Sequence, residues 1–245
     1  TSAGAVVLPS LANLYFNSSA NNGYFGVGND SVTNNSLSSG TTGLSSSDLR
    51  TTSAMTGLNF STGTLGSAAS GPAAAGNYWV LVDADGTFNN AGGATGASYP
   101  MLASEYALKV TSAHQLQLMG LAPSAQYVLQ NSVVFGNSDV WSGSGTGFVP
   151  VGTVANPFTG SFTGSALFSG SQTICPATAG GCTISNLSIT SALVSPVGMF
   201  GTVGASATIS GVRLANASVR GAGTVGALVG SNFNNDGTAL YEAMS

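Results

Sequence analysis

The sequence predicts an all-β, turn-rich protein built as a solenoid of short stacked strands. Two observations predict this class. Charged residues make up only 5% of the 245 residues, against about 25% in an average soluble protein, and Gly, Ser, Thr and Asn, which are poor residues for helix interiors, account for nearly half of the chain. Short apolar segments also recur at a nearly constant spacing toward the C-terminus, as repeated stacking units do.

The low charge also excludes several functions. The formal net charge is −4 and only four residues are basic, Arg50, Lys109, Arg213 and Arg220. A patch that neutralises phosphates cannot form, so nucleic-acid binding and polybasic docking to membranes are excluded. The chain has no apolar run of the length that membrane insertion requires. So few ionisable groups also predict a stability that changes little with pH.

The expected elements are placed by the turn and helix-cap residues of the chain. Residues 1–43 are a polar, low-complexity N-terminal segment, expected to act as a cap or an assembly arm, and residues 44–245 are expected to form one folded domain. Short helical turns are expected at 48–57, after an N-cap at Ser47 or Asp48, and at Ser112–Gly120. The expected strands are Tyr78–Val82, which precedes a tight turn at Asp85–Gly86, and Tyr127–Leu129, Val133–Phe135 and Phe148–Val149.

The repeats supply the candidate core. Thr183–Ile189 recurs as Thr208–Leu214, an offset of 25 residues, and Val197–Phe200 recurs as Val225–Leu228, an offset of 28. Each unit is too short to bury its own apolar face, so successive units must stack, with parallel strands about 4.8 Å apart. The predicted core positions are Ile184, Leu187, Ile189, Val197, Phe200, Ile209, Val212, Leu214, Val225 and Leu228.

The stretch from Val197 to Asn232 resembles the GLUG repeat of large bacterial surface proteins. Further segments, in order Tyr99–Leu102, Val110–Met119, Tyr127–Leu129, Gly147–Gly152 and Pro157–Gly160, are similar to filamentous haemagglutinin-like adhesins, which two-partner secretion exports. The resemblance covers roughly residues 44–235. It implies a right-handed parallel β-helix over 44–245, with GLUG-like repeats at about 183–232, in a protein secreted to the bacterial cell surface.

A secreted location bears on the two cysteines. In an oxidising compartment Cys175 and Cys182 are expected to form a disulfide that closes a small loop. Zinc would need about two more ligands, and His114 is the only histidine. We therefore expect no metal and no cofactor.

Two further features are candidates for catalytic or binding sites. Asp83 and Asp85 match part of a calcium loop, but Leu81 and Gly92 then fall at ligand positions. As an acid and base pair they have no Arg, His or aromatic cluster nearby, so a turn is favoured. His114 has no nucleophile motif to serve and is expected to be structural. No catalytic residue is predicted.

The sequence thus predicts a non-enzymatic extracellular adhesin or structural module. Its partners would be a host or bacterial cell-surface glycan or protein, or copies of itself joined as an oligomer or fibre. The alternative is a polysaccharide-active β-helix enzyme of the lyase or hydrolase type, which needs clustered carboxylates and bases. Eight acidic and four basic residues spread over 245 argue against that enzyme.

Overall fold

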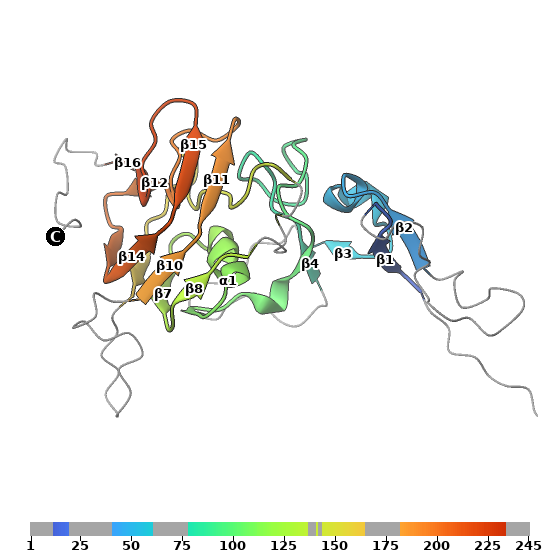
Figure 1. Ribbon diagram of the computed structural model, residues 1–245, viewed down its shortest axis with the longest axis horizontal. Coiled ribbons are helices and arrows are strands. Elements are labelled where there is room, and N and C mark those ends of the chain that lie inside the picture. The colour runs from blue at the N-terminus through green and yellow to red at the C-terminus, as the bar shows by residue number, and fades with distance from the viewer. Residues whose placement is uncertain are drawn as a thin grey trace, which may run out of the picture.

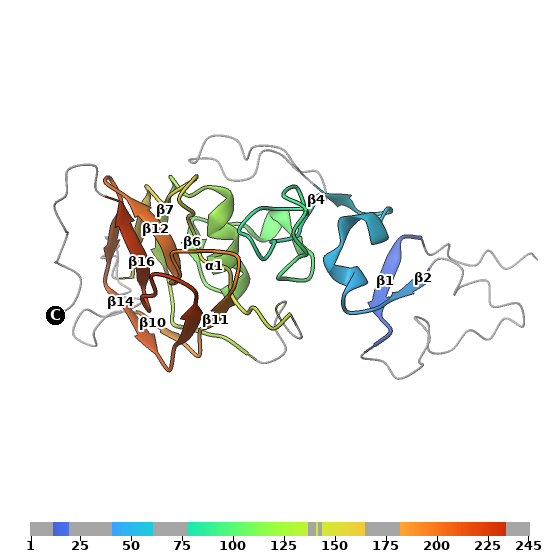
Figure 2. The same cartoon turned by 90° about the horizontal axis from the view of Figure 1, so that it is seen from above.

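Short strands dominate the part of the chain that the structure describes. The structure is a computed structural model, and it describes residues 12–19, 41–60, 78–136, 141, 144–164 and 182–233. Within these residues the strands form six sheets of two to four strands each. Figures 1 and 2 show the first strands at one end of the molecule and the last strands at the other.

The N-terminal unit comprises residues 12–19 and 41–60. In it β1 (Leu14–Asn17) pairs in parallel with β2 (Thr41–Leu44), a strand that contains the expected domain boundary after residue 43. Two 3-10 turns follow, η2 (Asp48–Arg50) and η3 (Thr52–Ala54). They replace the single helix expected over 48–57 because Thr51 between them is extended, with φ −133° and ψ 115°.

A three-stranded sheet joins this unit to the rest of the chain. Here β4 (Tyr78–Val80) pairs in parallel with β3 (Asn59–Phe60) and antiparallel with β5 (Met101–Leu102). The strand expected at Tyr78–Val82 is thus confirmed over its first three residues, and Val82 continues as a single bridge to Phe88. That bridge spans the expected turn at Asp85–Gly86.

One short α-helix lies between this sheet and the later strands. After η4 (Ala103–Glu105) and β6 (Lys109–Val110) the chain forms α1 (Ala113–Leu118) and the 3-10 turn η5 (Met119–Leu121). The helix begins where the sequence predicts it, because the Ser112 hydroxyl accepts a hydrogen bond from the backbone N–H of Gln115 at 3.3 Å.

Residues 109–233 hold four sheets of parallel strands, which we call the strand stack. The strand orders are β13–β9–β7–β6, β14–β10–β8, β11–β15 and β12–β16. The strands not yet given are β7 (Gln126–Leu129), β8 (Val133–Val134), β9 (Ser161–Thr163), β10 (Cys182–Ser185), β11 (Ser188–Ser191), β12 (Phe200–Gly204), β13 (Thr208–Ser210), β14 (Val212–Ala215), β15 (Ser218–Gly221) and β16 (Val229–Phe233). Because β13 to β16 each stand last in their sheet, we call residues 208–233 the terminal layer.

The predicted fold class, a right-handed parallel β-helix over residues 44–245, is wrong. The described strands form separate small sheets rather than one continuous helix of strands, the β4–β5 pair is antiparallel, and α1 interrupts the strands. The physical reason is that a short apolar repeat reports only the alternation of inward and outward side chains along one strand. It does not report the path of the chain between strands. Phe148 and Val149, for which a strand is expected, form no strand.

The register of the stack also corrects the predicted repeats. An offset of 25 residues would place Ile184 beside Ile209, but Ile184 pairs with Leu214 and Ile209 pairs with Phe162. The offset of 28 is confirmed where Val197 bridges to Val225. It fails three residues later, because Phe200 pairs with Val229 and not with Leu228.

Two asparagine turns account for the observed register. Asn186 follows β10 and Asn216 follows β14, and both lie in the left-handed region, with φ of 60° and 53°. The backbone N–H of Asn186 donates to the carbonyl of Ala215 at 2.9 Å. Asparagine is the residue other than glycine that adopts this conformation most readily. Equal turns keep β11 in register with β15 after β10 has paired with β14.

The predicted core positions divide between two environments. Ile184, Leu187, Ile189, Val197 and Phe200 are fully buried, whereas Ile209, Val212, Leu214 and Leu228 are half-buried against the core and Val225 is 43% exposed. Aromatic rings fill the centre of the stack, with the Phe200 ring centroid 4.7 Å from that of Phe158 and 5.6 Å from that of Phe162. The less buried positions all belong to the terminal layer.

The asparagine turn gives a first prediction. Asn186→Ala should lower the free energy of unfolding by about 1 kcal/mol, because an alanine pays the steric cost of a positive φ. Asn186→Gly should cost less, since glycine adopts this conformation freely. Urea unfolding of the two variants beside the native chain measures the difference. Equal losses from both substitutions would show that the asparagine side chain, and not its backbone conformation, matters.

A buried hydroxyl gives a second prediction. Thr202 on β12 is 1% exposed, and its Oγ1 has no hydrogen-bond partner. Thr202→Val keeps the shape and removes the unsatisfied group, so it should raise the free energy of unfolding by about 1 kcal/mol. Thr208→Val on the exposed face of β13 is the matched control and should change it by less than about 0.5 kcal/mol. Destabilisation by Thr202→Val would contradict the argument.

Candidate functional site

Asp83 and Asp85 converge on one threonine hydroxyl. Thr87 Oγ1 lies 2.6 Å from Asp85 Oδ1 and 3.0 Å from Asp83 Oδ2. A hydroxyl has a single proton, so it cannot donate to both carboxylates at once. The predicted turn is confirmed, because Gly86 has a φ of 84° and its N–H donates to the carbonyl of Asp83 at 3.0 Å.

The remaining contacts make Asp83 a structural carboxylate. It is fully buried, Oδ2 accepts from the backbone N–H of Asn90 at 2.7 Å, and Oδ1 accepts from Asn90 Nδ2 at 3.0 Å. Asn90 Nδ2 also donates to the carbonyl of Ala94 at 2.9 Å, and its Oδ1 accepts from Thr52 N–H at 2.8 Å. The cluster therefore holds the loop after β4 against the N-terminal unit. Among the described residues no group of three or more His, Cys, Asp or Glu side chains is placed to hold a metal ion.

Burial changes the acidity of this carboxyl. Removal from water raises the pKa of Asp83 from its ordinary value of 3.8 to about 6, although the hydrogen bonds from Thr87 and Asn90 oppose the shift and the nearby Asp85 carboxylate adds to it. The expectation of a stability that is nearly independent of pH therefore needs revision at this one residue.

The raised pKa gives a third prediction, whose sign follows from proton linkage. Between about pH 4 and pH 6 the folded chain keeps a proton on Asp83 that the unfolded chain has released. The free energy of unfolding should thus be highest below about pH 4 and fall by up to about 3 kcal/mol as the pH rises through 6. Urea unfolding at a series of pH values measures it. Asp83→Asn should remove this fall, and an identical pH profile in that variant would assign the effect to another group.

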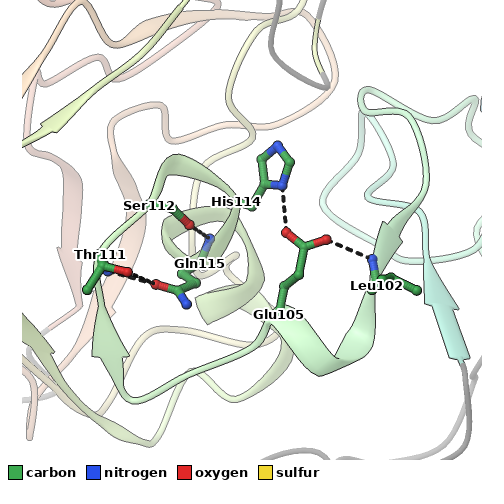
Figure 3. Close-up of polar contacts among 6 residues, drawn as sticks. All are labelled: Leu102, Glu105, Thr111, Ser112, His114 and Gln115. Atoms are coloured by element: carbon green, nitrogen blue, oxygen red, sulfur yellow. Dashed lines mark hydrogen bonds and ion pairs between the residues drawn. The ribbon is translucent and has the colours of Figure 1, made fainter.

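Glu105 and His114 form the second ionisable cluster. Figure 3 shows the Glu105 carboxylate between the imidazole of His114 and the backbone of Leu102. Glu105 Oε2 lies 2.7 Å from His114 Nδ1, and Oε1 accepts from Leu102 N–H at 3.2 Å. The two side chains are 34% and 32% exposed, and the His114 ring packs edge-on against Trp141. The pair ties η4 to α1.

The hydroxyls near this pair serve the helix end instead. Ser112 Oγ accepts from Gln115 N–H, and Gln115 Oε1 accepts from the N–H and the hydroxyl of Thr111 at 2.7 and 3.0 Å (Figure 3). No hydrogen bond connects Ser112 to His114 among these described contacts. The arrangement pairs the His114 imidazole with an orienting carboxylate, and no hydroxyl among these described contacts donates to the imidazole. The structural role of His114 stays a prediction.

A buried amide positions α1 on the strand stack. Gln117 is 2% exposed. Its Nε2 donates to the carbonyl of Val149 at 3.0 Å, and its Oε1 accepts from Val149 N–H at 2.8 Å and from Trp141 Nε1 at 3.0 Å. The side chain thus pairs with the backbone as a neighbouring strand does. A depression of about 40 Å³ lies beside Gln117, between Phe88 and Pro150. This volume is large enough for a water molecule but too small for a sugar or a nucleotide.

Sequence analysis did not single out Glu105, Asn90 or Gln117. Only Glu105 carried a local signal, since it stands three residues after Leu102 as the acidic member of a capping box does. The partners of Asn90 and Gln117 lie up to 40 and 32 residues away, and no local pattern indicates them.

The outward face of β11 and β15 is the candidate binding surface. Ser188 and Thr190 of β11 are exposed and stand in register with Ser218 and Arg220 of β15, which are also exposed. Ile189, between the first two, is fully buried. Residues 182–233 contain no acidic residue. The face therefore carries three hydroxyl groups and, next to Thr190, the guanidinium of Arg220.

The predicted disulfide falls partly outside the described residues. Cys182 is fully buried on β10, with its sulfur 3.3 Å from the carbonyl oxygen of Leu129. Cys175 lies outside the described residues, so its bond to Cys182 stays a prediction.

Comparison of the chain with family models, with curated proteins and with solved structures gives no match in any of the three. The resemblance to filamentous haemagglutinin-like adhesins therefore stays a prediction. In the part of the chain that the structure describes, no helix has the length and apolar character needed to cross a membrane.

Proposed function

We propose that this chain is a non-enzymatic extracellular module with an adhesive or structural role. The observation that supports it is the outward face of β11 and β15, which exposes the hydroxyls of Ser188, Thr190 and Ser218 and no carboxylate. Such a face makes many neutral hydrogen bonds and few ionic ones. It fits a polar partner such as a glycan or a protein on a host or bacterial cell surface.

Rigidity makes these hydroxyls useful for binding. Neighbouring parallel strands lie about 4.8 Å apart, and the buried Ile189 side chain anchors β11 from the opposite face. Hydroxyls fixed in this way lose little conformational entropy when a partner binds. Arg220 adds a planar guanidinium that recognises carboxylate or sulfate groups on two hydrogen bonds.

The alternative of a polysaccharide-cleaving enzyme has no support from the described carboxylates. Glycoside cleavage requires two carboxyl groups that flank the scissile bond. Asp83 is fully buried, and the Glu105 carboxylate is engaged by His114 and Leu102. Asp85 accepts hydrogen bonds from Thr87, and Asp48 accepts hydrogen bonds from Ser45. We therefore propose binding without cleavage.

The proposal gives a fourth prediction. The variant Ser188→Ala, Thr190→Val, Ser218→Ala should bind immobilised bacterial or host cell-surface glycans and proteins about tenfold or more weakly than the native chain, because three neutral hydrogen bonds contribute roughly 0.5–1.5 kcal/mol each. Surface plasmon resonance measures binding. All three positions are exposed, so the unfolding curve should not move. Thr208→Val with Ser210→Ala on β13 is the matched control and should bind normally.

Two results would overturn the proposal. One is undiminished binding by the triple variant on every surface that the native chain recognises. The other is release of reducing sugar from a glycan substrate, if that release disappears in Glu105→Gln or His114→Asn.

A further inference from the structure

The terminal layer is an open edge of the strand stack. β13, β14, β15 and β16 each have a strand neighbour on one side and none on the other among the described residues. Within the described ranges no strand pairs with the N–H and C=O groups on the open side, and unpaired groups of this kind make edge strands prone to pairing between chains.

Burial across the last two layers shows the same opening. Ile184, Leu187 and Ile189 are fully buried. Leu214 and Val219, the register partners of Ile184 and Ile189, are only half-buried. The inward row of side chains therefore continues into the terminal layer, and it lacks a cover there.

Surface charge differs between the terminal layer and residues 41–105. In the terminal layer Arg213 and Arg220 are exposed and stand in register with Thr183 and Thr190 of the layer beneath. Over residues 41–105 the described charges are mainly acidic: Asp48 is exposed, Asp85 and Glu105 are half-exposed, and the cation Arg50 is 5% exposed with its guanidinium over the Tyr99 ring.

Asp48 belongs to the N-terminal unit, and Arg213 and Arg220 belong to the terminal layer. Figures 1 and 2 both place the N-terminal unit at one end and the terminal layer at the other. A basic open edge and an acidic opposite part are complementary between copies of one chain, whereas two terminal layers that meet face to face bring arginines against arginines.

We propose that the terminal layer docks a second copy of this chain by its acidic part, residues 41–105, so that copies join head to tail. The contact covers Leu214 and Val219 and pairs the open strand edges, while Arg213 and Arg220 set the polarity. A contact between two different surfaces leaves both outer ends free, so it repeats into an open filament. This inference rests on the proposed structural role and names its partner.

The first test measures association of the full chain by sedimentation and light scattering over a range of concentrations. Mass should grow with concentration, and more strongly at about 20 mM salt than at about 500 mM, because salt screens exposed charges. R213E/R220E should lower the association constant about tenfold or more at low salt. R213K/R220K, which keeps both charges, is the matched control and should associate almost normally.

The second test examines polarity by mixing two variants. Asp48→Lys impairs the acidic part and leaves the terminal layer intact, while R213E/R220E does the reverse. Each alone should associate weakly. Their mixture should form a complex of one copy of each, because the intact terminal layer of the first meets the intact acidic part of the second.

Four outcomes would overturn the inference: a full chain that stays monomeric at every concentration, equal association by R213E/R220E, growth of the native chain that stops at two copies, or growth that appears only in a chain ending at Asn234. The third indicates two terminal layers face to face. The fourth indicates that residues 235–245, which contain Asp236 and Glu242, cover the edge themselves. Surface binding measured on Asp48→Lys, a change outside the face of β11 and β15 that carries Arg220, separates these results from failure of the proposed function, since a monomer that still binds glycans loses only the assembly.

Discussion

The structure depends on neutral amide side chains that satisfy buried backbone groups where no strand does. Irregular backbone that is buried must find hydrogen-bond partners, and a chain with so few charges has mainly Asn, Gln, Ser and Thr to provide them. Gln117 pairs with both backbone groups of Val149, and Asn89 Oδ1 accepts from Leu81 N–H at 2.8 Å. The Gln117 contacts hold α1 on the strand stack, and the Asn89 contact lies within the loop after β4. The buried Asp83 belongs to the hydrogen-bond network that holds this loop against the N-terminal unit.

The strand stack is also consistent with the small number of charged residues in the chain. Parallel strands bury one row of apolar side chains, and the turns at Asn186 and Asn216 transmit the register from one pair of strands to the next. The outward row is then free to carry hydroxyls. Stability and surface chemistry are thus assigned to alternate residues of the same strands, which allows the outward face to change without loss of the core.

The lateral face and the terminal layer of the strand stack differ in chemistry, and the proposed binding and the proposed assembly use one surface each. Its lateral face offers hydroxyls that are fixed by the buried row behind them, and its terminal layer offers strand edges with two arginines. The acids that are buried or paired, Asp83 and Glu105, serve the fold between the N-terminal unit and the strand stack. Charge is therefore concentrated at contacts within the fold and on the terminal layer, and the face proposed to bind a polar partner carries a single charged side chain, Arg220.

By itself, the sequence determined the short-strand character of the chain, the helix at Ser112, the turn at Asp85–Gly86 and the burial of Ile184, Ile189 and Phe200, because these features depend on residues close together in the chain. Tertiary structure alone decided the division into six sheets, the pairing of Ile184 with Leu214, and the contacts of Glu105, Asn90 and Gln117. Alternation of apolar and polar residues specifies which face of a strand is buried, but it does not specify which residue of a neighbouring strand stands opposite. Every inward apolar residue of that neighbour fits the pattern equally well. The choice among them rests on turns and long-range hydrogen bonds that exist only once the chain has folded.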